Sequence, residues 1–109
     1  LKTNYNRAKQ EGLLDRAYVY GCDEVSSNFF DNIRWALGEL KANLPDVPIS
    51  TTAYDNRYGV GTVLSPMDWF TPLTPSYDLA NASAARKEGR QVWWYICCGP
   101  HAPHANMFI

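Results

Sequence analysis

Ala17-Tyr18-Val19-Tyr20-Gly21-Cys22-Asp23-Glu24 is an aromatic and β-branched run that ends in two adjacent carboxylates. Its first six residues, 17–22, predict a short buried β-strand. Ionised carboxylates beside apolar surface are disfavoured unless they are paired or used in chemistry. If the strand belongs to a barrel of parallel strands, its carboxyl end is where catalytic groups are carried. The stretch therefore predicts a strand that leads into an enzyme active site at Asp23 and Glu24.

The segments around this strand alternate between helix and strand patterns. Apolar residues at spacings of three and four predict an amphipathic helix from Phe30 to Leu44, which Pro45 ends. N-cap oxygens are available just before it, on Ser26, Ser27 and Asn28. Further helices are expected at 4–11 and 77–88, further strands at 47–53, 67–70 and 91–97, and loops at 54–66 and 99–109.

This order predicts an α/β fold of parallel β/α units joined by right-handed crossovers. A TIM-type (β/α)8 barrel takes roughly 250 residues. The 109 residues therefore read as one segment, 1–109, that forms about half of such a barrel, with the remainder outside this chain. The amino end, which lacks an initiator Met, also indicates a piece of a longer chain. Open sheet edges predict that the segment needs the remaining barrel segments or an oligomeric partner.

Composition narrows the possible partners. Hydrophobic residues make up 46% and charged residues 19%, which is typical of a globular chain. The net charge of −1, with no basic run, argues against a nucleic acid or an anionic membrane surface as partner. No apolar stretch approaches the roughly 18 residues that span a bilayer. The absence of a glycine-rich phosphate loop after any strand argues against a nucleotide-binding fold.

The cysteines give weak evidence for a metal. Cys22, Cys97 and Cys98 are odd in number, so they predict buried thiols and no regular disulfide framework. His101 and His104 follow the vicinal pair, and sulfur with imidazole suits zinc. Vicinal cysteines lack the usual ligand spacing, so the sequence predicts no metal and no cofactor. A metal-dependent hydrolase centred on these four residues of the carboxyl end stays open as an alternative.

Residues 12–24 resemble the catalytic strand of glycoside hydrolase family 123 and its domain-of-unknown-function relatives, typically Tyr-Gly-Phe-Asp-Glu-Pro after an aromatic residue. Thr51-Thr52, residues 67–70 and residues 88–95 resemble later strands of that family, in order. The resemblance covers nearly the whole chain but only about the second half of the family's barrel. Cys22 and Val25 stand where the family has Phe and Pro, which puts substrate preference and loop shape in question more than the chemistry.

The resemblance implies an exo-acting β-N-acetylhexosaminidase, with galacto-configured substrates favoured, that retains anomeric configuration. In the implied substrate-assisted mechanism, the 2-acetamido oxygen of the sugar attacks its own anomeric carbon. Glu24 would be the general acid and then the base, and Asp23 would orient the acetamido group and stabilise the oxazolinium-like intermediate. The resemblance also implies a glycan or glycoconjugate substrate and a bacterial parent protein that is secreted or periplasmic.

The pair also makes chemical sense without the family. Adjacent residues of a regular strand point to opposite faces, so they meet in one cavity only where the strand ends and twists. Like charges this close should raise the pKa of one carboxyl, which would leave it protonated to act as an acid. The competing interpretation places Asp23 and Glu24 at the start of the following helix, where the helix dipole favours acidic residues.

Residues near the predicted strand ends are candidates for substrate contact: Tyr95, Trp69, Trp93, Tyr54, Asp68 and Asn106. Tyr95 would offer a hydroxyl near the carboxyl end of its strand. Tryptophan rings serve as core or as platforms for sugars, with core favoured here, and one of Trp93 and Trp94 should face the barrel interior while the other packs on helices. Asp68 could bind a sugar hydroxyl or form a salt bridge. A non-catalytic carbohydrate-binding or structural barrel segment stays open as the alternative function.

Overall fold

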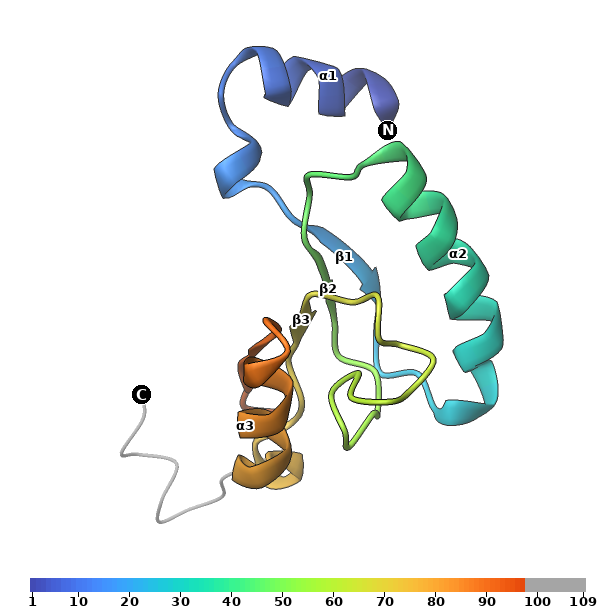
Figure 1. Ribbon diagram of the computed structural model, residues 1–109, viewed down its shortest axis with the longest axis vertical. Helices are drawn as coiled ribbons and strands as arrows, with labels where there is room; N and C mark the ends of the chain where they lie inside the picture. Colours follow the sequence, from blue (N-terminus) through green and yellow to red (C-terminus); the bar gives the residue numbers. More distant parts are fainter. Residues whose placement is uncertain (98–109) are drawn as a thin grey trace.

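The computed structural model describes residues 1–97, and within them helices alternate with parallel strands (Figure 1). The strands form one sheet in the order β1-β2-β3-β4, with every neighbouring pair parallel. This confirms the predicted α/β fold of parallel β/α units. The elements are α1 (Lys2–Gln10), η1 (Leu14–Arg16), β1 (Val19–Cys22), η2 (Ser27–Phe29), α2 (Phe30–Asn43), β2 (Ile49–Thr51), β3 (Trp69–Phe70), η3 (Thr74–Ser76), α3 (Leu79–Lys87) and β4 (Gln91–Val92).

The helices begin and end close to their predicted positions, whereas every strand is shorter than predicted. The last predicted strand, 91–97, is reduced to β4, and beyond it only an isolated bridge joins Leu73 to Tyr95. Pro72 lies opposite this region and has no N–H to donate, although its carbonyl accepts from the Tyr95 N–H at 3.1 Å. The ladder is therefore interrupted where the aromatic run predicted a continuous strand.

The core lies on one face of the sheet, where α2 and α3 pack. Leu37 of α2 and Ala82 and Ala85 of α3 are buried in one cluster with Ile49 of β2 and Phe70 of β3. Parallel strands normally have both faces covered. Among the residues described, however, large side chains on the opposite face, such as Tyr18, Tyr20 and Trp93, are exposed to solvent, and we call this surface the open face. It is lined by Tyr18, Tyr20, Ser50, Thr52, Trp69, Thr71, Trp93, Trp94 and Tyr95.

The start of α2 decides between the two interpretations of the carboxylate pair. The turn η2 separates Glu24 from α2, and the acidic residue in the first turn of α2 is Asp31. The expected capping by Ser26, Ser27 or Asn28 is also wrong, because the N-cap residue of α2 is Phe29 and no side chain caps α2 or η2. Asp23 and Glu24 therefore do not begin the helix, and the helix-start interpretation is wrong.

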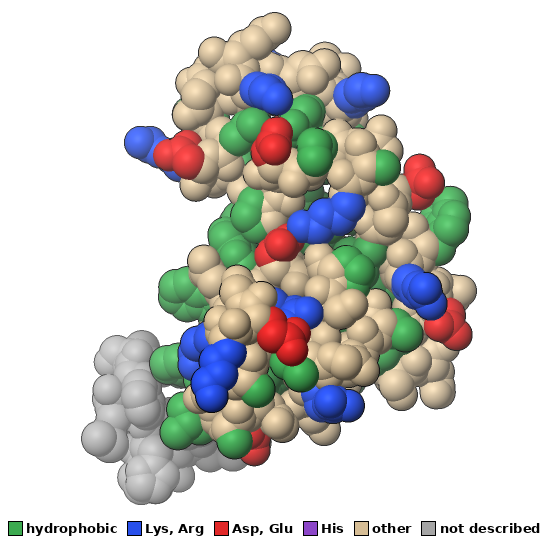
Figure 2. All heavy atoms as spheres, viewed as in Figure 1, with side chains coloured by type: hydrophobic (Ala, Val, Ile, Leu, Met, Phe, Trp, Pro, Cys, Tyr) green, Lys and Arg blue, Asp and Glu red, His purple; other side chains and the backbone are tan. Residues whose placement is uncertain are grey.

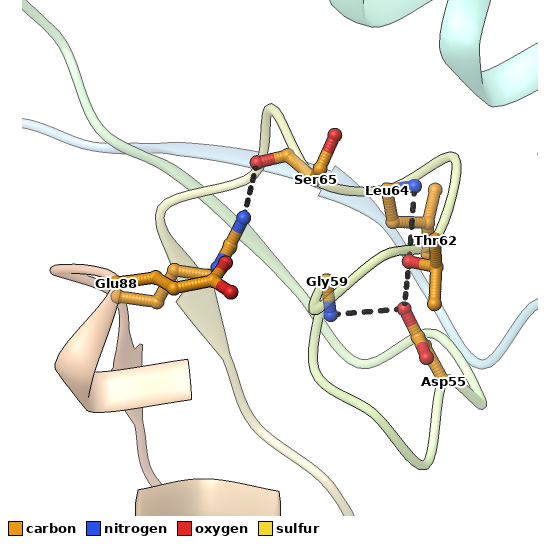
Figure 3. Close-up of polar contacts among 7 residues, drawn as sticks. Asp55, Gly59, Thr62, Leu64, Ser65 and Glu88 are labelled. Atoms are coloured by element: carbon orange, nitrogen blue, oxygen red, sulfur yellow. Dashed lines mark hydrogen bonds and ion pairs between the residues drawn. The ribbon is translucent and has the colours of Figure 1, made fainter. Parts of the chain in front are cut away.

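The loop between β2 and β3 is held in shape by one buried carboxylate. Asp55, only 6% exposed, accepts hydrogen bonds from the Gly59 N–H at 3.0 Å and the Thr62 hydroxyl at 2.6 Å (Figure 3). It also accepts one from the Arg57 N–H at 3.0 Å. Residues 54–66 thus form the predicted loop, but an ordered one, and its first residue is Tyr54.

On the face of the molecule drawn in Figure 2, Lys and Arg side chains are interspersed with Asp and Glu side chains, and neither charge forms a continuous patch. That distribution gives no electrostatic footprint for a polyanion on this face. In the part of the chain that the structure describes, no helix has the length and apolar character needed to cross a membrane.

Candidate active site

Two local irregularities bring the carboxylates to the carboxyl edge of the sheet. The pairing of β1 with β2 shifts register between Tyr20 and Cys22. Two residues further on, Glu24 has φ of 45°, the left-handed conformation that side chains other than glycine seldom adopt. In a regular strand Asp23 and Glu24 would point to opposite faces. Here both carboxyl groups instead bond hydroxyls of residues that line the open face.

Asp23 is held by two hydroxyl donors. The Tyr20 hydroxyl donates to Asp23 Oδ1 at 2.8 Å, and the Thr52 hydroxyl donates to the same oxygen at 2.9 Å. These hydrogen bonds, Tyr20 first and Thr52 second, lower the pKa of Asp23 below its ordinary value. Asp23 is therefore a carboxylate at neutral pH. The expected rise in the pKa of one carboxyl therefore does not occur at Asp23.

Glu24 is contacted by two phenols from different parts of the chain. The Tyr54 hydroxyl donates to Glu24 Oε2 at 3.1 Å, and the Tyr95 hydroxyl donates to Oε1. Hydrogen bonding to Glu24 raises the pKa of Tyr95, and desolvation followed by the same kind of hydrogen bond raises the pKa of Tyr54. Both tyrosines thus remain neutral donors at physiological pH and orient the Glu24 carboxyl.

The open face forms a shallow cavity of about 470 Å³ beside this pair. Its lining combines aromatic rings, among them Tyr18 and Trp69 with ring centroids 5.4 Å apart, and hydroxyl groups such as that of Thr52. Rings offer apolar platforms and hydroxyls offer hydrogen bonds, which together suit a ligand that is flat on one side and rich in hydroxyls.

The predicted contact residues divide into four groups. Tyr54 and Tyr95 meet Glu24 directly, and Trp69 and Trp93 line the cavity. Asp68 lies just before β3, at the opposite edge of the sheet. There it forms a salt bridge with Lys41 at 2.5 Å and accepts from the Ile49 N–H at 2.8 Å. Asn106 lies outside the described residues.

The tryptophans after β4 differ from the expectation for a buried strand. Trp93 and Trp94 are 56% and 57% exposed, so neither is packed beneath the helices. Trp94 makes an edge-on contact with Tyr77, with ring centroids 5.5 Å apart, and Trp93 Nε1 donates to the Gln91 side chain at 3.1 Å. The backbone nevertheless stays beside β3 and the residues after it, because the Trp93 N–H donates to the Phe70 carbonyl at 2.8 Å and the Tyr95 N–H donates to the Pro72 carbonyl.

No protein-family model and no curated protein matches this chain. The functional proposal therefore depends on the geometry of the site and on the sequence resemblance described above.

The metal alternative falls mostly outside the structure. Within residues 1–97, no group of three or more His, Cys, Asp and Glu side chains is placed to hold a metal ion. Cys98, His101 and His104 lie outside those residues. Cys22 is not one of the four residues of that alternative. It is only partly buried and Cys97 is exposed, so the expected burial of these two thiols is wrong.

The sequence reasoning missed Tyr20 and Thr52, the two residues that hold Asp23. A signal for both was present. Tyr20 lies two residues before Cys22 on the same strand, and Thr52 follows the second strand, so both approach the carboxyl edge that Asp23 occupies. Residues after neighbouring parallel strands meet at one edge of the sheet. That rule could have named Thr52 from its position alone.

Proposed function

We propose that this chain carries the catalytic carboxylates of an exo-acting β-N-acetylhexosaminidase that retains anomeric configuration by substrate-assisted catalysis, with galacto-configured substrates favoured. The observation that carries the proposal is the placement of Asp23 and Glu24 at the carboxyl edge of a parallel sheet, beside an aromatic and hydroxyl-lined cavity. The resemblance of residues 12–24 to glycoside hydrolase family 123 gives these two residues their roles.

The adjacency of the carboxylates favours assistance by the substrate. An ordinary retaining glycosidase places its acid and its nucleophile about 5–5.5 Å apart on the two sides of the scissile bond. Neighbours in sequence are poorly suited to reach both sides of a sugar. When the 2-acetamido oxygen of the substrate is the nucleophile, both protein carboxyls can work from one side.

The electrostatics fit the role proposed for Asp23. Because its pKa is lowered by two hydroxyl donors, Asp23 stays negative at neutral pH. A carboxylate can accept a hydrogen bond from the acetamido N–H and stabilise the positive charge that develops in the oxazolinium-like intermediate. Glu24, oriented by Tyr54 and Tyr95, would give its proton to the leaving oxygen and later remove one from water.

The open face and the two outer strands indicate that more protein packs against this sheet. Among residues 1–97, β1 and β4 each have a neighbouring strand on one side only, and the open face exposes Tyr18, Trp93 and Trp94 by more than half. We propose that further β/α units cover this face, supplied by remaining barrel segments or by an oligomeric partner. The full barrel would enclose the cavity and exclude water from the reacting sugar.

The test is release of chromophore from a chromogenic β-N-acetylgalactosaminide by the full-length protein. Glu24→Gln should lower turnover about 10²–10⁴-fold, the usual contribution of general acid–base catalysis. Glu39→Gln, an exposed glutamate on α2, is the matched control and should keep wild-type turnover. Turnover that survives in Glu24→Gln would refute the role of Glu24. The matching glucosaminide, assayed in parallel, reports the preferred sugar configuration.

A non-catalytic carbohydrate-binding segment is the second candidate, and the exposed rings of Trp93 and Trp94 favour it. Binding by stacking needs no acid. In that case Glu24→Gln would leave glycan affinity nearly unchanged, Trp93→Ala would weaken it, and no chromophore would be released by the wild type.

A further inference from the structure

The Thr52 hydroxyl is the one group that bonds both members of the carboxylate pair among the described contacts. It donates to Asp23 Oδ1 at 2.9 Å and accepts from the backbone N–H of Glu24 at 3.0 Å. The Tyr20 hydroxyl also lies 2.6 Å from it. We infer that Thr52 is a positioning residue that fixes Asp23 and Glu24 relative to each other, an inference that rests on the proposed function.

The hydrogen bonds of this hydroxyl join it to both residues of the pair. A threonine hydroxyl has one proton to donate and two lone pairs to accept with. The proton goes to Asp23 and one lone pair takes the Glu24 N–H. The Tyr20 oxygen lies close to the Thr52 oxygen, but its own proton is donated to Asp23 in this arrangement. Thr52 is 8% exposed and β-branched, so its side chain has little freedom to rotate. Such a group defines one geometry for the pair.

The backbone supports the same role. The Thr52 N–H donates to the carbonyl of Cys22 at 3.3 Å, so the residue after β2 is tied to the last residue of β1. The hydroxyl then reaches past that bond to the next two residues along the chain. Its bond to the Glu24 N–H supports the left-handed backbone at Glu24, where φ is 45°. A strained conformation of this kind persists only when its surroundings fix it.

This arrangement matters because the proposed reaction needs both carboxyls in place at once. Asp23 must meet the acetamido group while Glu24 meets the leaving oxygen of the same sugar. Misplacement of a reacting group by about 1 Å can cost on the order of 100-fold in rate. Loss of the Thr52 hydroxyl removes the donor to Asp23 and the acceptor for Glu24 together, so it should disturb orientation more than binding.

The kinetic test compares variants of the full-length protein on the chromogenic β-N-acetylgalactosaminide. Thr52→Val, which keeps the shape and removes the hydroxyl, should lower kcat about 100-fold, with KM changed by less than about threefold. Thr52→Ser, which keeps the hydroxyl, should restore most of the turnover. Thr3→Val makes the same substitution at an exposed position of α1, outside the cavity, and as the control it should keep wild-type kcat. Wild-type kcat in Thr52→Val, or equal loss in Thr52→Ser, would overturn the inference.

A second measurement is independent of turnover. NMR titration of the Asp23 carboxyl should show a higher pKa in Thr52→Val than in the wild type, because one of the two donors that lower this pKa is lost. Thr3→Val should leave the titration unchanged. An unchanged Asp23 titration in Thr52→Val would refute the placement of Thr52. If the wild type releases no chromophore, the proposed function fails, and this titration still decides whether Thr52 holds Asp23.

Discussion

Asp55 offers the sharpest test of how the fold supports the site. Its buried side chain accepts three hydrogen bonds that close the loop after β2, from Arg57, Gly59 and Thr62. A hydrogen bond to a charged group contributes about 1.5–3 kcal/mol, and loss of the acceptor leaves buried donors unpaired. Since bonds made by one side chain are not additive, Asp55→Ala should lower the free energy of unfolding by about 3–5 kcal/mol.

The assay is urea unfolding of the full-length protein, read as the change in transition midpoint at constant slope. Asp15→Ala, at an exposed position on η1, is the control and should change stability by less than about 0.5 kcal/mol. Asp55→Asn should fall between the two, because it keeps the shape but replaces one acceptor oxygen with a donor. Equal midpoints for Asp55→Ala and Asp15→Ala would refute the view that this carboxylate organises the loop.

The remaining predictions concern one tyrosine, one core residue and one carboxylate. The pKa of Tyr95 is raised because its proton is held by Glu24, so Glu24→Gln should bring the Tyr95 pKa back down in an ultraviolet or NMR titration; an unchanged value would exclude the contact. Phe70→Ala should cost about 3–5 kcal/mol in urea unfolding because Phe70 is 1% exposed, whereas Phe29→Ala, at 55% exposure, should cost under about 1 kcal/mol. The pKa of Asp23 is lowered in the folded protein, so its stabilising contribution is complete above its unfolded pKa of about 3.9 and is lost as the pH falls through the lowered value. In Asp23→Asn, the free energy of unfolding should therefore decline less steeply over this acidic range than in the wild type. Equal declines in the two proteins would contradict this prediction.

The sequence predicts the helices well because their signals are local. The spacing of apolar residues from Phe30 to Leu44 anticipates α2, which ends one residue earlier, at Asn43. The alanine-rich run before Gly89 anticipates α3, and Gly89 has the positive φ expected at a helix end. Each of these patterns depends on neighbours within a turn or two of the chain.

Strand ends depend on distant partners, so the sequence predicts them poorly. Nothing in the aromatic run after Gln91 shows that its partner strand is followed by Pro72, which cannot continue the ladder with an N–H. The same limit applies to the site. The position of Asp23 and Glu24 follows from the strand pattern, but the contacts to Thr52, Tyr54 and Tyr95 join residues far apart in the chain. Their pairing becomes visible only when the parallel order of the sheet is known.

The left-handed backbone at Glu24 sets backbone strain against side-chain contacts at a single position. Glycine adopts φ near 45° without the penalty that a side chain brings, which is about 1 kcal/mol or more. Glu24→Gly would remove that strain, but it would also remove the acceptor of the hydrogen bonds from Tyr54 and Tyr95. The change in the free energy of unfolding would therefore be the difference between these two contributions.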